Sequence, residues 1–432
     1  MPTAWPRCVE APKAEVARRR YWNLRKIPIV PFRLATEEPL DLISDPATDE
    51  QFLHRALDLA RQGTGLASPN PYVGAVIVDS RGSIVGEGAY TYDGLKHAEV
   101  LALEQAGDKA RGGTLYINLE PHSHQGRTPP CTDALITAGI QRVVASMADP
   151  NPKVSGRGFD KLRAAGVQVE VGLFEAEARR LNESFTRYIR HGVPFVTLKS
   201  AMTLDGKIAP PPSSPARRTE GVPSGGWITG EASRAHVHLQ RHQSDAILVG
   251  IGTILADDPL LTDRSGSPRR RPLLRVILDS RLGLPVGSRI VQSVTSDNKS
   301  QDDVLVFCSS AEPKKKRDLE ARGVRVEQLP SAPSGRLDLH AVLRRLGELE
   351  ITSLMIEGGG AVNGAALTSR VVDKLFLYYA PTILGAGALP FATDADTNTG
   401  FIRETLCVKH LQLHRFGEDI AVEGYLRDPC EG

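Results

Sequence analysis

The sequence has few cysteines and no long apolar run. Its five cysteines among 432 residues are odd in number and widely scattered, which is not the pattern of a disulfide-stabilised domain. Scattered cysteines are typical of proteins in a reducing compartment, so we expect a cytoplasmic location. Apolar residues nowhere fill the roughly 18 consecutive positions that a transmembrane helix needs, so no membrane partner is expected.

An excess of charge of one sign is also lacking. The 53 lysines and arginines nearly balance the 51 aspartates and glutamates, for a formal net charge of +2. A nucleic-acid-binding protein usually carries a basic stripe, so we expect no nucleic-acid partner. The hydrophobic fraction of 41% is ordinary for a globular protein, and the length predicts two or three domains.

The first 48 residues differ from the rest of the chain. They contain Arg18-Arg19-Arg20 and several prolines, but no apolar core of a secretory signal. They also contain glutamates, which an organelle transit peptide tends to avoid. We therefore expect residues 1–48 to be a disordered extension, or the product of an upstream start codon, rather than a targeting segment.

From residue 49 to 193, short apolar strands alternate with helical patterns, which is typical of a layered α/β domain. The strands are predicted at 73–78, 114–119, 142–147 and 167–171. The helices are predicted at 49–60, 97–106, from 131, at 161–165 and at 175–190. Gly192-Val193-Pro194 stops the last helix and marks the domain boundary.

A second alternation follows over residues 194–432. Its strands are predicted at 195–200, 246–250, 273–279, 304–308, 354–357 and 374–380. Two segments of biased composition, 210–224 and 265–271, are predicted to be surface loops. The second contains Arg269-Arg270-Arg271; this run could grip a phosphate, but we expect a solvated loop.

One set of residues in the first half points to a metal site. His97 and Glu99 stand two residues apart, His122 follows a predicted strand, and Pro130-Cys131 opens a later helix. Zinc binds imidazole and thiolate and, in catalytic sites, leaves a position for water. A carboxylate that is not a ligand is then needed to move protons. Each residue alone is compatible with a plain structural role, but the combination favours a zinc-activated water.

The second half contains a glycine run, Gly358-Gly359-Gly360, after an apolar strand. Glycines allow a backbone to approach a pyrophosphate closely. The run also fits an ordinary turn, and it lacks the spacing of a Rossmann fingerprint. Ser280 and Arg281 end another strand and could select a 2′-phosphate, although a simple turn fits them about as well.

Several motifs occur in a fixed order along the chain. In the first half they are Pro69-Asn70-Pro71-Tyr72-Val73-Gly74, His97-Ala98-Glu99, Leu119-Glu120-Pro121 and Gly126-Arg127-Thr128-Pro129-Pro130-Cys131. In the second half they are Lys199-Ser200-Ala201-Met202-Thr203-Leu204-Asp205-Gly206-Lys207, Trp227-Ile228-Thr229-Gly230, Asp257-Asp258-Pro259-Leu260-Leu261-Thr262 and Glu357-Gly358-Gly359-Gly360. From about residue 50 onward, the chain resembles the bifunctional deaminase/reductase family of riboflavin biosynthesis.

The resemblance implies a fold and two reactions. The fold would be an N-terminal cytidine-deaminase-like α/β/α domain followed by a dihydrofolate-reductase-like α/β domain. The first domain would use Zn²⁺ to remove an amino group, as ammonia, from a diaminopyrimidinone that carries a phosphoribosylamino group. The second would use NADPH to reduce the ribose of that product to a ribityl chain. Family members are commonly homo-oligomers, so self-association is expected.

The resemblance also implies roles for residues of the first domain. His97, His122 and Cys131 match the metal ligands, and Glu99 matches the catalytic proton carrier. Asn70 would contact the pyrimidine. The phosphoribosyl part would be held by Arg127, Asp149 and Asn151.

One ligand departs from the family pattern. The family usually has cysteine after Leu-Glu-Pro, where this chain has His122. Histidine is itself a zinc ligand, so we expect a working site with a net positive centre. The alternative is a degenerate, metal-free first domain and a chain that is a reductase only. His124 is a further candidate ligand that matches an ordinary loop position.

Roles in the second domain follow in the same way. The positions that match cofactor contacts are Ala201, Trp227, Thr253, Asp257, Ser280, Gly359, Gly360, Ala361, Val362, Asn363, Gly364 and Ala365. The positions that match substrate contacts are Arg241, Leu261, Arg264 and Glu357. The family often has serine two residues before the tryptophan, where this chain has Gly225, and the substrate contact there is left open.

Two rival functions fit the sequence less well. A deaminase of nucleosides or RNA is opposed by the phosphate-matching residues and by the attached reductase. A non-enzymatic scaffold or nucleic-acid-binding protein is opposed by the near-neutral charge and by two complete site patterns.

Overall fold

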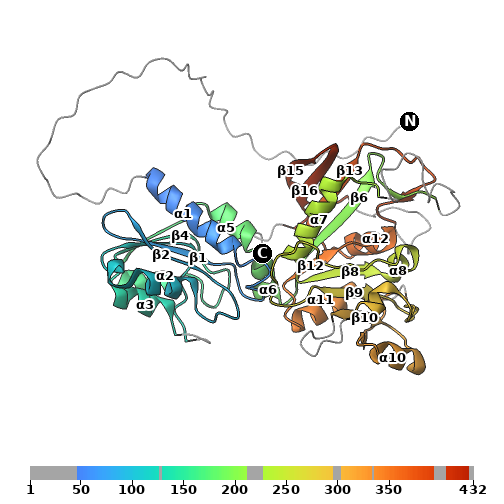
Figure 1. The fold of residues 1–432 in the computed structure, drawn as a ribbon, viewed down its shortest axis with the longest axis horizontal. Coiled ribbons are helices and arrows are strands. Elements are labelled where there is room, and N and C mark those ends of the chain that lie inside the picture. The colour runs from blue at the N-terminus through green and yellow to red at the C-terminus, as the bar shows by residue number, and fades with distance from the viewer. Residues whose placement is uncertain are drawn as a thin grey trace, which may run out of the picture. The chain divides into compact units, whose positions relative to one another are not determined.

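The structure is a computed structural model that describes residues 46–125, 129–211, 227–294, 303–332, 335–393 and 405–427. Residues 47–432 form one compact unit, which contains two large β-sheets flanked by helices (Figure 1). Almost all of the extension predicted over residues 1–48 lies outside the described residues. Among the helices that are described, none has both the length and the apolarity to cross a membrane.

The first sheet has the strand order β2-β1-β3-β4-β5. Its strands are β1 (Gly74–Val78), β2 (Ile84–Ala89), β3 (Thr114–Leu119), β4 (Arg142–Met147) and β5 (Gln168–Val171). Strand β1 is antiparallel to β2 and β3, whereas β3, β4 and β5 run parallel. All five residues of β1 are buried, as expected of a strand covered on both faces.

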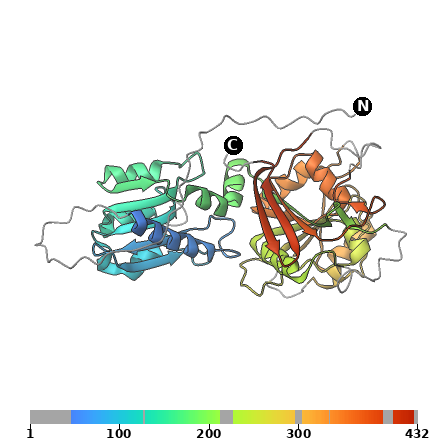
Figure 2. The ribbon, with the colours of Figure 1, turned by 90° about the horizontal axis from the view of Figure 1, so that it is seen from above.

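Helices cover both faces of this sheet (Figure 2). They are α1 (Pro46–Arg61), α2 (Ala98–Ala106), α3 (Cys131–Ala138), α4 (Arg157–Ala164), α5 (Glu175–Leu181) and α6 (Glu183–His191). Helices α2, α3 and α4 share one apolar core with the sheet. Helices α1 and α5 pack on the opposite face. The α/β/α layering predicted from the sequence is therefore confirmed.

Two glycines allow α2 to lie directly on β2. A Cβ on Gly86 would come within 2.0 Å of the carbonyl oxygen of Ala102, and a Cβ on Gly88 within 2.1 Å of that of Ala98. Any side chain at either position would push the helix away from the sheet. This close packing fixes the first turn of α2.

The second sheet has the order β11-β10-β9-β8-β12-β6-β13-β16-β15. Its strands are β6 (Phe195–Thr203), β8 (Ala246–Gly250), β9 (Leu274–Leu278), β10 (Val304–Cys308), β11 (Arg325–Gln328), β12 (Ser353–Ile356), β13 (Lys374–Ala380), β15 (Lys409–Phe416) and β16 (Asp419–Tyr425). The sheet is parallel from β11 to β13, and β16 runs antiparallel to both β13 and β15. A separate short ribbon pairs β7 (Lys207–Ala209) with β14 (Leu389–Pro390).

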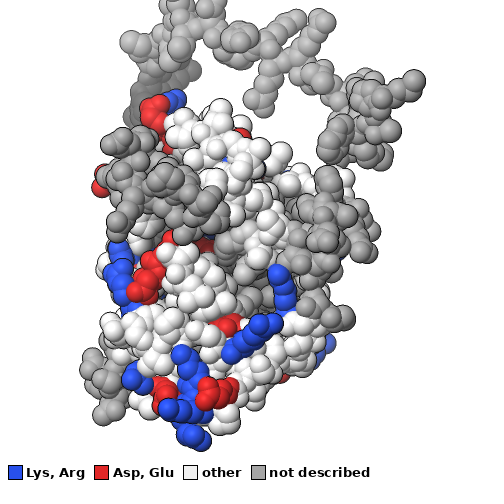
Figure 3. Space-filling model, turned by 90° about the vertical axis from the view of Figure 1, so that its right-hand side faces the viewer, with Lys and Arg blue, Asp and Glu red and all other residues white. Residues whose placement is uncertain are grey.

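The helices of this domain also cover both faces. They are α7 (Glu231–Gln243), α8 (Ile251–Asp257), α9 (Arg289–Gln292), α10 (Pro313–Glu320), α11 (Leu339–Glu348) and α12 (Gly360–Thr368). Along β8, Leu248 points into the core shared with α11 and α12, while its neighbours Ile247 and Val249 join the core shared with α8, α9 and α10. This alternation follows the two-residue period of a strand. Figure 3 shows basic and acidic side chains intermixed on one face of the molecule.

The predicted single helix over 175–190 is wrong in one respect. The structure has two helices that meet at Asn182, which is 1% exposed. The Asn182 side chain accepts a hydrogen bond from the backbone N–H of Tyr72 at 2.8 Å and donates one to its carbonyl at 3.1 Å. Since this contact spans 110 residues, helical periodicity alone could not show it.

The loop at 265–271 has no regular secondary structure, as predicted, but its arginines are not solvated. The Arg269 guanidinium donates to the carbonyls of Arg241, His242 and Ser244, at 3.1, 2.8 and 2.6 Å. The expectation of a solvated run was therefore wrong, because these charges are used to satisfy backbone carbonyls. The part of the other predicted loop that spans 212–224 lies outside the described residues.

Candidate active sites

The three predicted metal ligands lie together in the first domain. His97 is the N-cap of α2, Cys131 is the first residue of α3, and His122 lies in the loop after β3. One ligand atom from each residue lies within 4.8 Å of the others. The rings of His97 and His122 are 4.3 Å apart. His124 is exposed and stands outside this group, although its ring lies 5.4 Å from that of His122.

Glu99 lies in the first turn of α2, beside the same group. Its side chain is 3% exposed, and Oε2 has no hydrogen-bond partner among the described residues. Burial raises the pKa of Glu99, and burial together with Glu99 raises the pKa of the Cys131 thiol. A buried carboxylate oxygen without a partner is costly unless a ligand or a solvent molecule satisfies it.

The donor set fits zinc. Two imidazoles and one sulfur are ligands that zinc prefers, and three protein ligands leave the fourth position of a catalytic site for water. The carboxylate of Glu99 is available to that position without being one of the ligands. His97, His122 and Cys131 would hold the metal.

Asn70 is linked to the metal-binding group by contacts of Tyr90. Its side-chain amide donates to the Tyr90 hydroxyl at 2.6 Å, and the Tyr90 ring meets the His97 ring edge-on at 5.5 Å. The structure therefore connects the residue predicted to contact the pyrimidine with the residues predicted to bind the metal. Arg127 lies outside the described residues.

Asp149 and Asn151 are joined in one loop. The backbone N–H of Asn151 donates to the Asp149 carboxylate at 2.8 Å, and burial raises the pKa of Asp149 to about 6. The buried carboxylate of Glu120 accepts from the backbone N–H groups of Asp149, Gly156 and Gly158. Glu120 therefore shapes this loop, a role that its place in the Leu119-Glu120-Pro121 motif did not predict.

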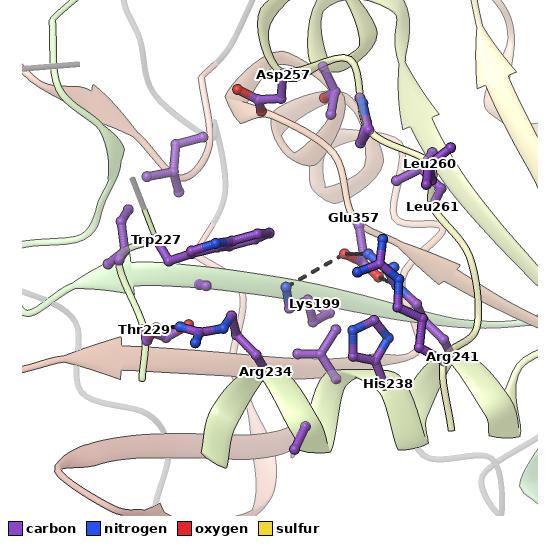
Figure 4. Close-up of a pocket in the computed structure, with 18 of the residues that line it drawn as sticks. Lys199, Trp227, Thr229, Arg234, His238, Arg241, Asp257, Leu260, Leu261 and Glu357 are labelled. Carbon is purple, nitrogen blue, oxygen red and sulfur yellow. Dashed lines mark hydrogen bonds and ion pairs between the residues drawn. The ribbon is translucent and has the colours of Figure 1, made fainter. Parts of the chain in front are cut away.

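Two cavities with shared walls occupy the second domain. The larger, of about 870 Å³, contains the predicted residues Trp227, Arg241, Leu261, Arg264 and Glu357. Figure 4 labels Trp227, Arg241, Leu261 and Glu357 among its lining residues. The smaller, of about 410 Å³, contains Gly359, Gly360, Ala361 and Val362. Ala201, Thr253, Asp257 and Glu357 line both. The predicted cofactor residues and substrate residues thus meet along a common wall.

An ion-pair cluster lies at that wall. Arg241 donates to both carboxylate oxygens of Glu357, at 2.7 and 3.0 Å, and the Lys199 ammonium is 3.6 Å from the same carboxylate. Burial opposes ionisation of Glu357, but the charges of Lys199 and Arg241 outweigh it and lower its pKa to about 2. Burial also lowers the pKa of Lys199. Figure 4 shows Lys199 between Trp227 and the Arg241–Glu357 pair.

Sequence reasoning missed several polar residues of the larger cavity, of which four are basic. The four are Lys199, Arg234, His238 and Arg289. Lys199 belongs to a motif that was noticed, but its side chain reaches both cavities only because β6 lies beside β12 in the sheet. The other three come from α7 and α9, and no sequence signal marked them.

Some predicted cofactor residues do not line either cavity. The side chain of Asn363 is buried and donates to the Phe391 carbonyl at 2.7 Å, and a Cβ on Gly364 would lie 1.9 Å from the Thr393 carbonyl oxygen. Ala365, in the same helix, packs against an apolar core. Ser280 also lies outside both linings. Gly225 is not among the described residues.

Comparison with known proteins identifies a known family in each of the two domains. Residues 46–147 match the cytidine and deoxycytidylate deaminase zinc-binding region, and residues 194–422 match the RibD C-terminal domain. The riboflavin biosynthesis protein RibD of Aquifex aeolicus is 40% identical over 374 residues, which are 87% of this chain and 97% of that protein. The RibD protein of Escherichia coli K12 is 41% identical and covers 80% of this chain and 91% of its own. The chain belongs to the RibD family.

Solved RibD structures have the same fold. Acinetobacter baumannii RibD matches with a TM-score of 0.73 and 33% identity, over 88% of this chain and 99% of its own. A diaminohydroxyphosphoribosylaminopyrimidine deaminase/5-amino-6-(5-phosphoribosylamino)uracil reductase from Thermotoga maritima matches with a TM-score of 0.69 and 36% identity, again over 88% and 99%. This RibD-family chain is a bifunctional enzyme of riboflavin biosynthesis, with zinc and NADPH as its cofactors.

The reductase-only alternative is not favoured for this RibD-family enzyme. It depended on His122 being unable to replace cysteine as a ligand. The structure places a His122 ring nitrogen in the same group as His97 and Cys131. The replacement therefore keeps a donor atom where the group needs one.

Proposed function

We propose that this enzyme deaminates a diaminopyrimidinone that carries a phosphoribosylamino group, and then reduces the ribose of that product to a ribityl chain. The deaminase would span residues 49–193 and the reductase residues 194–432. The observation that carries the proposal is the convergence of His97, His122 and Cys131 beside the buried Glu99. The adjoining cavities of the second domain support the reductive half.

In the first domain, His97, His122 and Cys131 would hold a zinc ion, which would lower the pKa of a water molecule toward neutrality. Glu99 takes the proton of the attacking water on its free Oε2 and delivers it to the departing amine. The water oxygen bonds to the ring carbon, the bond from that carbon to the amino nitrogen breaks, and ammonia leaves while the ring keeps a carbonyl. Asn70 would hold the pyrimidine, and Asp149 and Asn151 would bind the phosphoribosyl part, a role that the family resemblance also gives to Arg127.

In the second domain, the wall that contains Gly359, Gly360 and Ala361 would hold NADPH, which would supply a hydride. The anomeric carbon of the ribose would gain that hydride, its bond to the ring oxygen would break, and the oxygen would take up a proton. Lys199 holds a proton where the two cavities meet, and among the described residues it is the only lysine that lines either one. Glu357 fixes the Lys199 ammonium, while Arg241 and Arg264 provide positive charge for the substrate phosphate.

Each reaction can be tested in the intact chain. Ammonia release from the diaminopyrimidinone substrate, without NADPH, is measured for zinc-loaded protein and for protein treated with a chelator. Release that the chelator abolishes supports the deaminase. Oxidation of NADPH is then measured with the deaminated product. A folded, zinc-loaded protein that oxidises NADPH but releases no ammonia would refute the proposed deaminase activity.

We also propose that the enzyme self-associates in the cytoplasm. Strand β15 is the edge of the second sheet, and its Leu411 and Leu413 side chains are 61% and 75% exposed. An exposed apolar edge strand is a natural surface for pairing with a second copy. The buried Cys308, which forms no disulfide, agrees with a reducing compartment. Light scattering of the wild type and of Leu413→Lys tests the association, and a wild type that is a monomer at all concentrations contradicts it.

A further inference from the structure

An arginine of the reductase domain contacts two loops of the deaminase domain. The backbone N–H of Arg270 donates to the Gly65 carbonyl at 2.8 Å, and its guanidinium donates to the Ser68 carbonyl at 3.1 Å. The same guanidinium lies over the Tyr92 ring, 3.6 Å from its centroid, and its Nε is 3.6 Å from the Asp93 carboxylate. One side chain therefore touches the loop at 63–70 and the loop at 90–96.

These two loops lead directly into the proposed deaminase site. The first ends at Asn70, whose amide donates to Tyr90, and the second ends at His97, the N-cap of α2. The loops are also joined to each other, because the Tyr92 backbone N–H donates to the Leu66 carbonyl at 3.0 Å. A shift of either loop would therefore move Asn70 relative to the metal-binding group.

The residues on both sides of Arg270 are anchored to the reductase domain. Its neighbour Arg269 binds three carbonyls of the reductase domain and the Asp263 carboxylate, and Arg271 donates to the Glu350 carbonyl at 2.8 Å. The Arg270 side chain itself is 15% exposed. A guanidinium that is largely withdrawn from water, stacked on an aromatic ring and bonded to a carbonyl holds its partners more firmly than an exposed ion pair does.

The loop at 63–70 of the deaminase domain packs closely against the loop at 265–271 and against His242. Gly65 has a φ of 74°, and a Cβ at this position would lie 2.9 Å from the His242 ring and 3.1 Å from the Pro268 carbonyl oxygen. Only glycine combines this backbone conformation with so close an approach. The contact is therefore built from both domains.

We propose that Arg270 of the reductase domain is a positioning residue for deamination, because it fixes the two loops that carry Asn70 and lead into His97. The inference rests on the proposed deaminase activity and deepens it. Arg270 is not one of the proposed metal ligands, and its role would be exerted through the loops that it contacts. The deaminase half thus depends on a part of the chain that performs the other reaction.

The test is a kinetic comparison of both activities in the full-length chain. Arg270→Met keeps an unbranched aliphatic side chain but removes the charge, the guanidinium over the Tyr92 ring and the side-chain hydrogen bond to Ser68. We expect the KM for ammonia release to rise roughly tenfold, the factor that corresponds to about one substrate hydrogen bond, with a smaller change in kcat. Reduction of the separately prepared deaminated product should keep its KM and kcat. Arg270→Lys, which restores the charge without the planar fork, should recover part of the deaminase KM.

Arg322→Met is the matched control, because Arg322 is an exposed arginine of the same domain whose guanidinium donates to the nearby Asp318 carbonyl. It should leave both activities unchanged. An unchanged deaminase KM in folded Arg270→Met overturns the proposal, and so does a parallel loss of both activities, which would mean general destabilisation. If Arg270→Met does not fold, Tyr92→Leu removes the ring from the deaminase side, and a normal KM there overturns the proposal equally. A wild type that releases no ammonia would instead refute the proposed function itself.

Discussion

The Arg241 guanidinium grips both carboxylate oxygens of Glu357 at the wall shared by the two reductase cavities. Because Glu357 has a pKa of about 2 in the folded chain, against an ordinary value of 4.5, the unfolded chain binds more protons between these values. The stabilisation is therefore fully present above about pH 4.5 and is lost as the pH falls toward 2. Acid should weaken the reductase domain through this group.

Glu357→Gln tests that relationship. Removing the charge leaves Lys199 and Arg241 buried without their counter-ion, so we expect a loss of about 3 kcal/mol at neutral pH. The variant should also lose less additional stability than the wild type between pH 6 and pH 3. Urea unfolding at several pH values measures both effects, with the exposed Asp160→Asn as the control. Identical acid dependence of Glu357→Gln and wild type would contradict the assignment.

The second prediction concerns zinc retention. His122→Ala removes one of three ligand atoms, so we expect zinc content after dialysis to fall well below one ion per chain. His122→Cys supplies a thiolate at the same place and should retain zinc. His124→Ala should also retain zinc, since His124 stands outside the group. Elemental analysis gives the answer without any assay, and an unchanged zinc content in His122→Ala would remove His122 from the ligand set.

The sequence could predict these ligands because their chemistry is local. His97 and Cys131 each open a helix after a strand, and that pattern is visible without coordinates. Lys199 and Arg289 could not be placed, because their approach to one cavity depends on the strand order of the second sheet. The prediction of a solvated loop at 269–271 was wrong for a related reason. A charged side chain is expected in solvent unless the fold brings acceptors to it. Here the acceptors are carbonyl groups of α7 and of a deaminase loop, which are distant in the sequence.

The third prediction follows from the break between α5 and α6. Asn182→Ala removes the side chain that satisfies both the N–H and the carbonyl of Tyr72. Two buried backbone groups would lose a partner, and we expect a destabilisation of roughly 2 kcal/mol. Gln141→Ala, at an exposed position, should change the unfolding midpoint little. A midpoint for Asn182→Ala equal to that of wild type would show that water replaces the amide fully.

The last prediction concerns a buried arginine behind the substrate cavity. Arg275 is 2% exposed and donates to the Leu260 carbonyl at 3.0 Å and to the Asp303 carboxylate at 2.6 Å. Leu261, which follows Leu260 in the chain, has a φ of 55° and lines the cavity. A leucine holds this conformation only when its surroundings impose it. Arg275→Met should therefore let Leu261 relax, raising the KM of the reductase for its substrate while ammonia release continues unchanged. Its unfolding midpoint should fall as well, because Asp303 loses its counter-ion. If the reductase KM stays constant while the midpoint falls, Arg275 stabilises the sheet without shaping the cavity.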